Sequence, residues 1–145
     1  MTKMLASVTG PEEAAVALAG GADIIDLKDP ARGALGAVDS RAVRDTVAAI
    51  AGRRAVSAVT GDTPMRPDAV LAAAETMAAT GADYIKQGLF PGGEPEACIR
   101  ALAPLSARTR LIAVLFADRG PDFSLVPLLA ESGFAGAMLD TAGKS

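Results

Sequence analysis

The chain has 145 residues, half of them hydrophobic, with a formal net charge of −3 and a pI near 4.9. These values favour one compact domain, residues 1–145, and exclude a nucleic-acid surface because no basic cluster exceeds Arg53-Arg54. No apolar run approaches the roughly 20 residues that cross a bilayer, and the N-terminus lacks an export signal. The single cysteine, Cys98, permits no internal disulfide, so we expect a cytoplasmic protein without a membrane partner.

Apolar runs typical of β-strands alternate along the chain with segments typical of helices. The strand-like runs begin near Met4, Asp23, Arg54, Asp83, Arg110 and Ala135. The helix-like segments span residues 11–19, 39–50, 67–80, 94–105 and 123–132. The first opens with Pro-Glu-Glu, a favourable first turn, and Asp39 or Ser40 can cap the second. Pro104 and Pro127 lie within the last two segments, so the residues at which these helices begin and end are uncertain from the sequence.

A local repeat marks where helices end and strands begin. Residues 20–26 resemble residues 80–86 and, more loosely, residues 132–138: each is a glycine helix stop followed at once by a strand. Strict β-helix-β alternation predicts an α/β protein with a parallel sheet, either doubly wound or a (β/α)8 TIM barrel. Nothing resembles the glycine motifs of a dinucleotide fold or a P-loop, and we favour the barrel.

The visible elements account for only part of such a barrel. Six strands and five helices are predicted, whereas a closed barrel has eight of each in about 250 residues. We therefore expect the chain to be the N-terminal part of a longer barrel. The alternative is a self-contained open sheet, or a part-barrel completed in a homo-oligomer, because exposed parallel edges favour association.

The placement of lysine points to the chemistry. Three of the four lysines, Lys28, Lys86 and Lys144, follow or end strand-like runs, whereas the ten arginines lie mostly in helices or loops. Arginine keeps its proton in proteins, but a partly desolvated lysine can lose it and become a nucleophilic amine. The pattern predicts amine chemistry at the mouth of the sheet.

Carboxylates accompany these lysines. Residues i and i+2 of a strand share a face, so Asp26 lies with Lys28, and Asp140 lies on the corresponding face of the last strand. We predict that these residues and Lys86 converge at the carboxyl ends of the strands, with Lys144 reaching in from the next loop. Crowded lysines beside aspartates provide a neutral amine next to a proton donor, as imine formation requires. Ordinary ion pairs closing a barrel rim are the alternative, although arginine would serve equally there.

Other residue types narrow the chemistry further. The chain has no histidine, which excludes a Ser-His-Asp triad, a Cys-His pair and the usual zinc sites. We interpret Asp23 and Asp83 as turn caps, Tyr84 as a packing residue and Cys98 as a buried small hydrophobe. Glycine-rich loops at 29–37, 60–64 and 87–93 could bring backbone amides to a phosphate, but such loops are common without a ligand. Arg32 could assist there, although an exposed loop arginine is the simpler interpretation.

Several segments together resemble the signature of the (5-formylfuran-3-yl)methyl phosphate synthases. They are residues 20–30 with 33–37, residues 56–62, residues 81–86 with 88–89, and residues 138–142 with Lys144. The resemblance implies a TIM barrel that condenses two molecules of glyceraldehyde 3-phosphate into 4-(hydroxymethyl)-2-furancarboxaldehyde phosphate, a furan precursor of methanofuran-type one-carbon carriers. It implies a carbon-oxygen lyase that needs no metal or organic cofactor.

The resemblance also implies roles for individual positions. Lys28 would form the Schiff base and Lys86 would accept a proton, while Asp26, Asp140 and Lys144 match further charged active-site positions. The chain departs from the family in length, because members carry the remaining barrel units. Another Schiff-base aldolase or phosphosugar lyase on the same fold, or a non-catalytic fragment that binds anions or self-associates, remains an alternative.

Overall fold

The computed structural model describes residues 1–143, in which six strands alternate with five α-helices. The strands are β1 (Leu5–Val8), β2 (Ile24–Leu27), β3 (Ala55–Val59), β4 (Tyr84–Leu89), β5 (Arg110–Phe116) and β6 (Gly136–Asp140). The helices are α1 (Pro11–Ala19), α2 (Ser40–Ile50), α3 (Pro67–Ala78), α4 (Pro95–Leu102) and α5 (Val126–Glu131). Within this range, no helix has the length and apolar character needed to span a membrane.

The predicted elements are confirmed, with two adjustments near prolines. The segment 94–105 is helical only to Leu102 and continues as the 3₁₀ helix η2 (Ala103–Ala107), and the segment 123–132 begins with the 3₁₀ turn η4 (Phe123–Leu125). Pro104 and Pro127 lack the N–H that an α-helix uses, so each lies in the first turn of its element. Short 3₁₀ turns also form η1 (Pro30–Arg32) and η3 (Ala117–Arg119).

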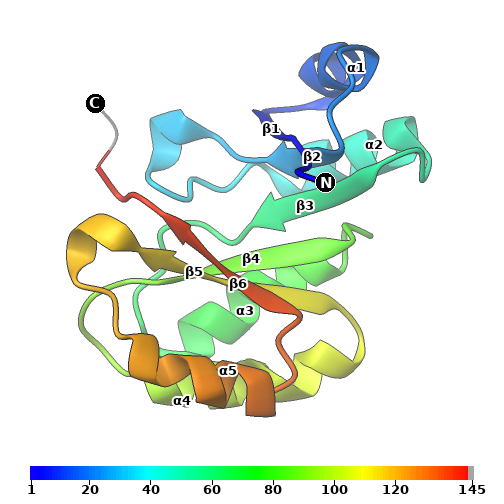
Figure 1. The fold of residues 1–145 in the computed structure, drawn as a ribbon. Helices are drawn as coiled ribbons and strands as arrows, with labels where there is room; N and C mark the ends of the chain where they lie inside the picture. Colours follow the sequence, from blue (N-terminus) through cyan, green and yellow to red (C-terminus); the bar gives the residue numbers. More distant parts are fainter. Residues whose placement is uncertain (144–145) are drawn as a thin grey trace.

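All six strands are parallel and lie in the order in which the chain makes them, β1 to β6 (Figure 1). A doubly wound sheet would reverse its direction of growth at a switch point, and this sheet has none. Successive right-handed crossovers that step the same way place their helices on one face of the sheet. The result is a curled sheet with an outer face covered by helices and a second face, here called the inner face, turned away from them.

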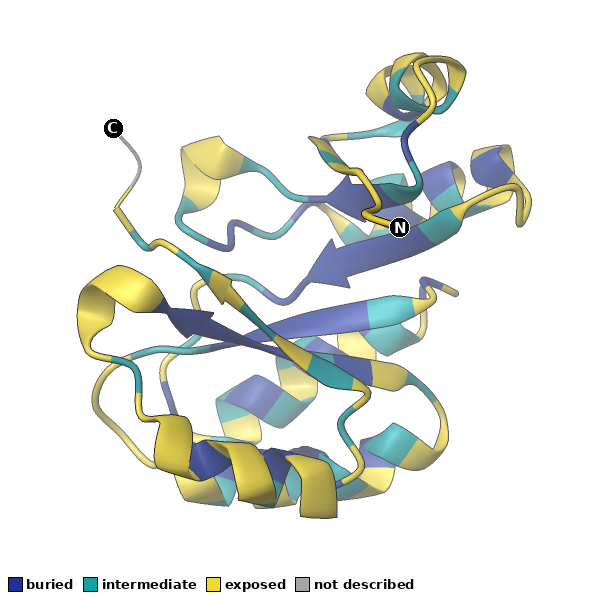
Figure 2. Cartoon of the chain, viewed as in Figure 1, coloured by how far each residue is buried: buried dark blue, intermediate teal, exposed yellow. Residues whose placement is uncertain are grey.

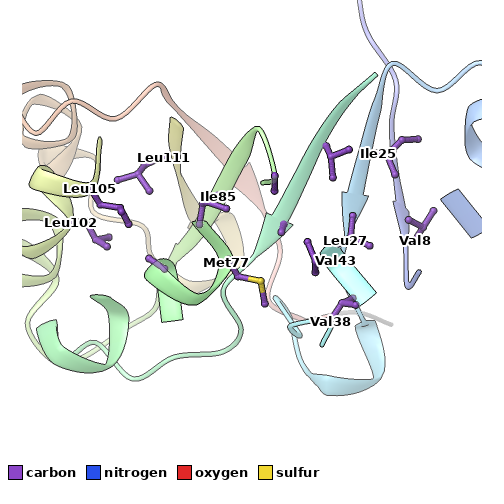
Figure 3. Close-up of a cluster of buried hydrophobic side chains, with 14 of the residues drawn as sticks. Val8, Ile25, Leu27, Val38, Val43, Met77, Ile85, Leu102, Leu105 and Leu111 are labelled. Carbon is purple, nitrogen blue, oxygen red and sulfur yellow. The ribbon is translucent and has the colours of Figure 1, made fainter. Parts of the chain in front are cut away.

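The main hydrophobic core lies between the outer face and the helices (Figure 3). Ile25, Leu27 and Ile85 are fully buried there and meet Val43 of α2 and Met77 of α3. Figure 2 shows the central strands as buried, whereas β6 is only partly covered. Leu139 on β6 leaves 58% of its surface exposed. Among the described residues β6 pairs only with β5, so this edge of the sheet is open.

Aspartates tie two of the strands, β2 and β4, to the strand before each of them. The carboxylate of Asp23 accepts a hydrogen bond from Met4 N at 2.8 Å, and Asp83 accepts one from Val56 N at the same distance. Each aspartate also donates its own N–H to the carbonyl of that residue. The interpretation of Asp23 and Asp83 as structural residues is therefore confirmed, and both lie at the amino ends of the strands, away from the predicted site.

Replacing Asp83 tests this tie between strands. We expect Asp83→Ala to lower the free energy of unfolding by about 1 kcal/mol, because the Val56 N–H loses its charged acceptor. Asp45→Ala, at an exposed position on α2, is the matched control and should change it by less than about 0.5 kcal/mol. Urea unfolding of both variants measures the difference, and equal effects would contradict the structural role.

Candidate active site

A fully buried carboxylate, that of Asp26 on β2, lies on the inner face. Asp26 is paired in register with Ser7 of β1 and Ser57 of β3, so the three side chains form a row across neighbouring strands. Ser57 Oγ donates to Asp26 Oδ1 at 2.6 Å, and Ser7 Oγ donates to Asp26 Oδ2 at 3.0 Å. Both carboxylate oxygens therefore have a hydroxyl donor, which offsets part of the cost of burying the charge.

Lys86 completes this cluster from β4. Its Nζ donates to Asp26 Oδ1 at 3.1 Å, and the lysine side chain is only 4% exposed. The contact crosses over β3, which lies between the two strands. The sequence prediction that Asp26 and Lys86 meet on one face is therefore confirmed in geometry.

A second pair joins strands that are farther apart. Lys28, which follows β2, donates from Nζ to Asp140 Oδ2 on β6 at 3.1 Å, although three strands lie between them. In a flat sheet those strands would be about 19 Å apart, as four spacings of about 4.8 Å. Extended lysine and aspartate side chains together reach only about 9 Å beyond their Cα atoms. The contact therefore requires the strong curl of the sheet toward its inner face.

Four of the five predicted site residues thus form two lysine–carboxylate pairs on the inner face. Asp26, Lys28 and Asp140 lie near the carboxyl ends of β2 and β6, whereas Lys86 lies in the middle of β4. The fifth, Lys144, lies outside the described residues.

Neither Ser7 nor Ser57 stands out in the sequence as a candidate site residue. Their place in the strand alternation is a weak signal that becomes informative only once the register with Asp26 is known. Ser57 also lies within the family-like segment 56–62.

Two loops at the mouth of the sheet are held by carboxylates from neighbouring loops. Asp62, after β3, accepts hydrogen bonds from Ala34 N at 3.0 Å and Leu35 N at 2.7 Å in the loop that follows β2. Leu35 is fully buried against the inner-face residues Val59 and Phe116. Asp62 therefore orders the glycine-rich loop 29–37 and directs Leu35 into the mouth.

The loop after β6 is held in the same way by Asp118. Its two carboxylate oxygens accept hydrogen bonds from Ala142 N at 2.7 Å and Gly143 N at 2.8 Å. These backbone donors lower the pKa of the Asp118 carboxyl below its ordinary value of 3.8. The arrangement orients the segment that follows Asp140.

The other residues singled out from the sequence serve packing and loop structure. Cys98 is buried and unpaired, and its burial raises the pKa of the thiol above its ordinary value. Arg32 pairs with Asp29 and donates to Ala37 O within its own loop while remaining largely exposed. The guanidinium of Arg110 lies 5.5 Å from the centre of the Tyr84 ring. These contacts agree with the structural interpretation of Cys98, Arg32 and Tyr84.

Two cavities lie on the inner face and at the mouth of the sheet, and Lys86 lines the first of them. One, of about 240 Å³, is bordered on the inner face by Ser57, Lys86 and Met138 among other residues. The other, of about 280 Å³, lies at the mouth between Asp62, Phe90 and Arg119. Within residues 1–143, no cluster of three or more potential ligands from Asp, Glu, Cys and His could hold a metal ion.

The sequence model of one protein family, described as 4-HFC-P synthase, matches residues 4–145. The chain belongs to this family. It is 48% identical over 143 residues to a Methylorubrum extorquens protein provisionally named (5-formylfuran-3-yl)methyl phosphate synthase, covering 99% of the chain and 58% of that protein. It is 37% identical over 154 aligned positions to the (5-formylfuran-3-yl)methyl phosphate synthase of Methanopyrus kandleri, covering 98% of the chain and 65% of the relative. The chain therefore spans less than two thirds of either relative.

Solved structures agree on the fold. A phosphoenolpyruvate phosphomutase from Streptomyces platensis subsp. rosaceus superposes with a TM-score of 0.70 at 16% identity, over 97% of this chain and 60% of that one. A dihydrodipicolinate synthase from Agrobacterium tumefaciens gives 0.69 at 19% identity, over 94% and 54%. At this level of identity the likeness concerns the α/β fold alone.

The ordering of loop 29–37 by Asp62 can be tested at Gly33. Gly33 has a φ of 131°, and a Cβ there would lie 2.2 Å from Asp62 Oδ2, so Gly33→Ala must displace the carboxylate. Gly92→Ala is the control, because Gly92 also has a positive φ of 84° but open space around it. We expect the Gly33 variant to be less stable than the control by about 2 kcal/mol and to lose amide-exchange protection at Ala34 and Leu35. Equal stability and protection in the two variants would contradict the role of Asp62.

The hydrogen bonds from Ala142 N and Gly143 N to the Asp118 carboxylate should depend on pH. Because the folded pKa is lowered, the interaction stabilises the loop above the ordinary carboxyl pKa of 3.8 and is lost as the pH falls through the folded value. The amide proton shifts of Ala142 and Gly143, followed by NMR, should therefore titrate with a midpoint below 3.8. The titration should vanish in Asp118→Asn, and a midpoint at or above the ordinary value would contradict the assignment.

Proposed function

We propose that the complete protein condenses two molecules of glyceraldehyde 3-phosphate into 4-(hydroxymethyl)-2-furancarboxaldehyde phosphate, with release of one phosphate and two waters. Membership of the 4-HFC-P synthase family supports this reaction, and the names of the relatives point to the same product. The observation that carries the proposal is the pairing of two lysines with two aspartates on one face of the sheet. That arrangement supplies an amine nucleophile and a separate proton carrier.

We further propose that this chain forms the first six strands and five helices of a (β/α)8 barrel. The curl needed for the Lys28–Asp140 contact supports closure, because it already turns β6 back toward β2. The longer relatives support additional units, since the chain spans 58% and 65% of the two described above. The partly covered strand β6, with Leu139 exposed, is the edge onto which the next unit would pair.

Lys28 is proposed as the residue that forms the covalent intermediate. Its Nζ lies 3.1 Å from Asp140 Oδ2, which can take the proton that the amine must lose before it attacks a carbonyl. Attack on the aldehyde of one triose phosphate and loss of water give an imine at Lys28. The protonated imine then accepts the electron pair left when the neighbouring carbon loses its proton.

Lys86 is proposed as the acceptor of that proton. It must first release its own proton, and Asp26 Oδ1 at 3.1 Å provides the route. The enamine formed at Lys28 attacks the aldehyde of the second triose phosphate and makes the new carbon–carbon bond. Loss of phosphate, ring closure, elimination of water and release from the lysine then give the aromatic furan. The imine itself is the electron sink, so this scheme needs no metal or organic cofactor.

Trapping the imine tests the assignment of the two lysines. Borohydride added to the full-length protein with glyceraldehyde 3-phosphate should attach a triose phosphate to Lys28, as found by peptide mass spectrometry. Lys28→Arg should lose the adduct and furan absorbance together. Lys86→Ala should still form the adduct while furan formation falls by about 10²- to 10⁴-fold, because only the proton transfer is lost.

Lys3→Arg is the matched control, since Lys3 lies in the exposed N-terminal segment, and it should behave like the wild type. An active enzyme in which Lys28 stays unmodified would contradict the imine. An open-chain sugar phosphate as the only product would instead identify a Schiff-base aldolase.

A further inference from the structure

We propose that Ser57 is a positioning residue for proton transfer at Lys86 and that it acts through Asp26, with Ser7 as a second, weaker support. The inference rests on the proposed function of the same site. It assigns a role to two hydroxyl groups that the reaction scheme leaves unused. Among the described residues neither hydroxyl is hydrogen-bonded to the lysine amine, so their effect on it passes through the carboxylate.

The register of the sheet creates the arrangement. Ser7, Asp26 and Ser57 are direct neighbours on β1, β2 and β3, and paired residues of adjacent strands point to the same face. Lys86 lies on β4, two positions beyond Tyr84, which is the register partner of Ser57. Its side chain therefore reaches Asp26 from a position farther toward the carboxyl ends of the strands. The carboxylate of Asp26 is thereby held by a hydroxyl on each side and by an ammonium group from the carboxyl end of the sheet.

Ser57 and Lys86 share one oxygen of this carboxylate. Ser57 Oγ lies 2.6 Å from Asp26 Oδ1 and Lys86 Nζ lies 3.1 Å from the same atom, whereas Ser7 Oγ lies 3.0 Å from Oδ2. Two donors on opposite oxygens fix the rotation of the carboxylate plane about the last side-chain bond. The direction in which Asp26 presents Oδ1 to Lys86 is therefore determined by the two serines.

Because Ser57 is buried and Ser7 is exposed, loss of the Ser57 hydroxyl should disturb the orientation of Asp26 more than loss of the Ser7 hydroxyl. Asp26 is 0% exposed and Ser57 is 2% exposed, so the Ser57 hydroxyl is a buried donor to a buried carboxylate. Ser7 lies on the exposed edge strand β1, where water can substitute for its hydroxyl. Removing the Ser57 hydroxyl leaves Asp26 Oδ1 with Lys86 as its donor and lets the carboxylate turn.

A misoriented Asp26 carboxylate should affect one step of the proposed reaction, the removal of a proton from the imine by Lys86. Lys28 and Asp140 form the imine through a separate contact, so adduct formation at Lys28 does not depend on Ser57. Proton removal from the imine does depend on it, because Lys86 must first pass its own proton to a correctly oriented Asp26. A role in packing alone would instead weaken both steps together.

The test uses the full-length protein with Ser57→Ala, Ser57→Thr and the control Ser106→Ala. Ser106 is also partly buried, and its hydroxyl donates to Ala103 O within η2, the turn that leads from α4 to β5. We expect Ser57→Ala to lower kcat for furan formation by about 10- to 100-fold, the range typical of losing a hydrogen-bond partner one step removed from the reacting group. KM and the rate of borohydride trapping at Lys28 should stay within about twofold of wild type.

We expect the Ser57 hydroxyl, and not the size of the side chain, to determine kcat. Ser57→Thr keeps it and should recover most of kcat, while Ser106→Ala should match the wild type. Unchanged kcat in Ser57→Ala would overturn the proposal, and so would a parallel loss of Lys28 trapping and folding stability. If Ser57→Ala fails to fold, the Ser7→Ala variant provides the test. We expect it to lower kcat by about twofold to tenfold while the rate of borohydride trapping at Lys28 stays at the wild-type value.

A second measurement needs no furan product. Formaldehyde with borohydride methylates lysine amines, and mass spectrometry gives the rate at each lysine. Loosening of the Asp26–Lys86 contact should raise the rate at Lys86 by about threefold or more in Ser57→Ala, relative to Ser57→Thr and to Lys3 in the same protein. Equal rates would overturn the positioning role. A wild-type protein that makes no furan would refute the proposed function while leaving this comparison intact.

Discussion

The buried contact between Asp26 and Lys86 is the interaction on which the inner face depends. Both side chains are almost fully removed from water, and a buried ion pair generally contributes little net stability because desolvation offsets the attraction. Apolar residues of similar size would fill the space at no greater cost. Stability alone therefore does not account for the pair, whose two serine hydroxyls on the carboxylate agree with the proposed proton transfer at Lys86.

Curvature of the sheet adds a second lysine–aspartate pair, Lys28 with Asp140, to the same inner face. A parallel sheet without curl could bring Asp26 to Lys86 across one strand, but it could not bring Lys28 to Asp140 across three. The curl follows from burying the outer face under a continuous layer of helices, in which residues such as Ile25, Ile85 and Val43 pack together. The hydrophobic core thus places the charged residues, although it contains none of them.

The fold was largely predictable because its signals are local. Glycine helix stops, aspartate ties such as Asp23 and Asp83, and apolar strand runs each occupy a few consecutive residues. The convergence of four candidate residues was also predictable, because alternation along a strand places Asp26 with Lys28 and the carboxyl ends of parallel strands meet at one edge of the sheet. The strand order and one-sided helix layer exclude a doubly wound sheet, which the same alternation had left open.

Other features could not be predicted because they depend on distant partners. The pairing of Ser57 with Asp26 requires the register between two strands, and the hold of Asp62 on Leu35 requires the contact between two loops. Neither leaves a periodic signal in the sequence. The limits of α4 and α5 were also open, because a proline can begin a helix or end one.

The most direct test of the account is a crystal structure of the full-length protein soaked with glyceraldehyde 3-phosphate. We predict continuous density from Lys28 Nζ to the substrate, with Lys86 Nζ about 3–3.5 Å from the neighbouring substrate carbon and in contact with Asp26. A substrate bound outside the inner face, or Lys28 and Lys86 facing opposite sides of the sheet, would contradict it.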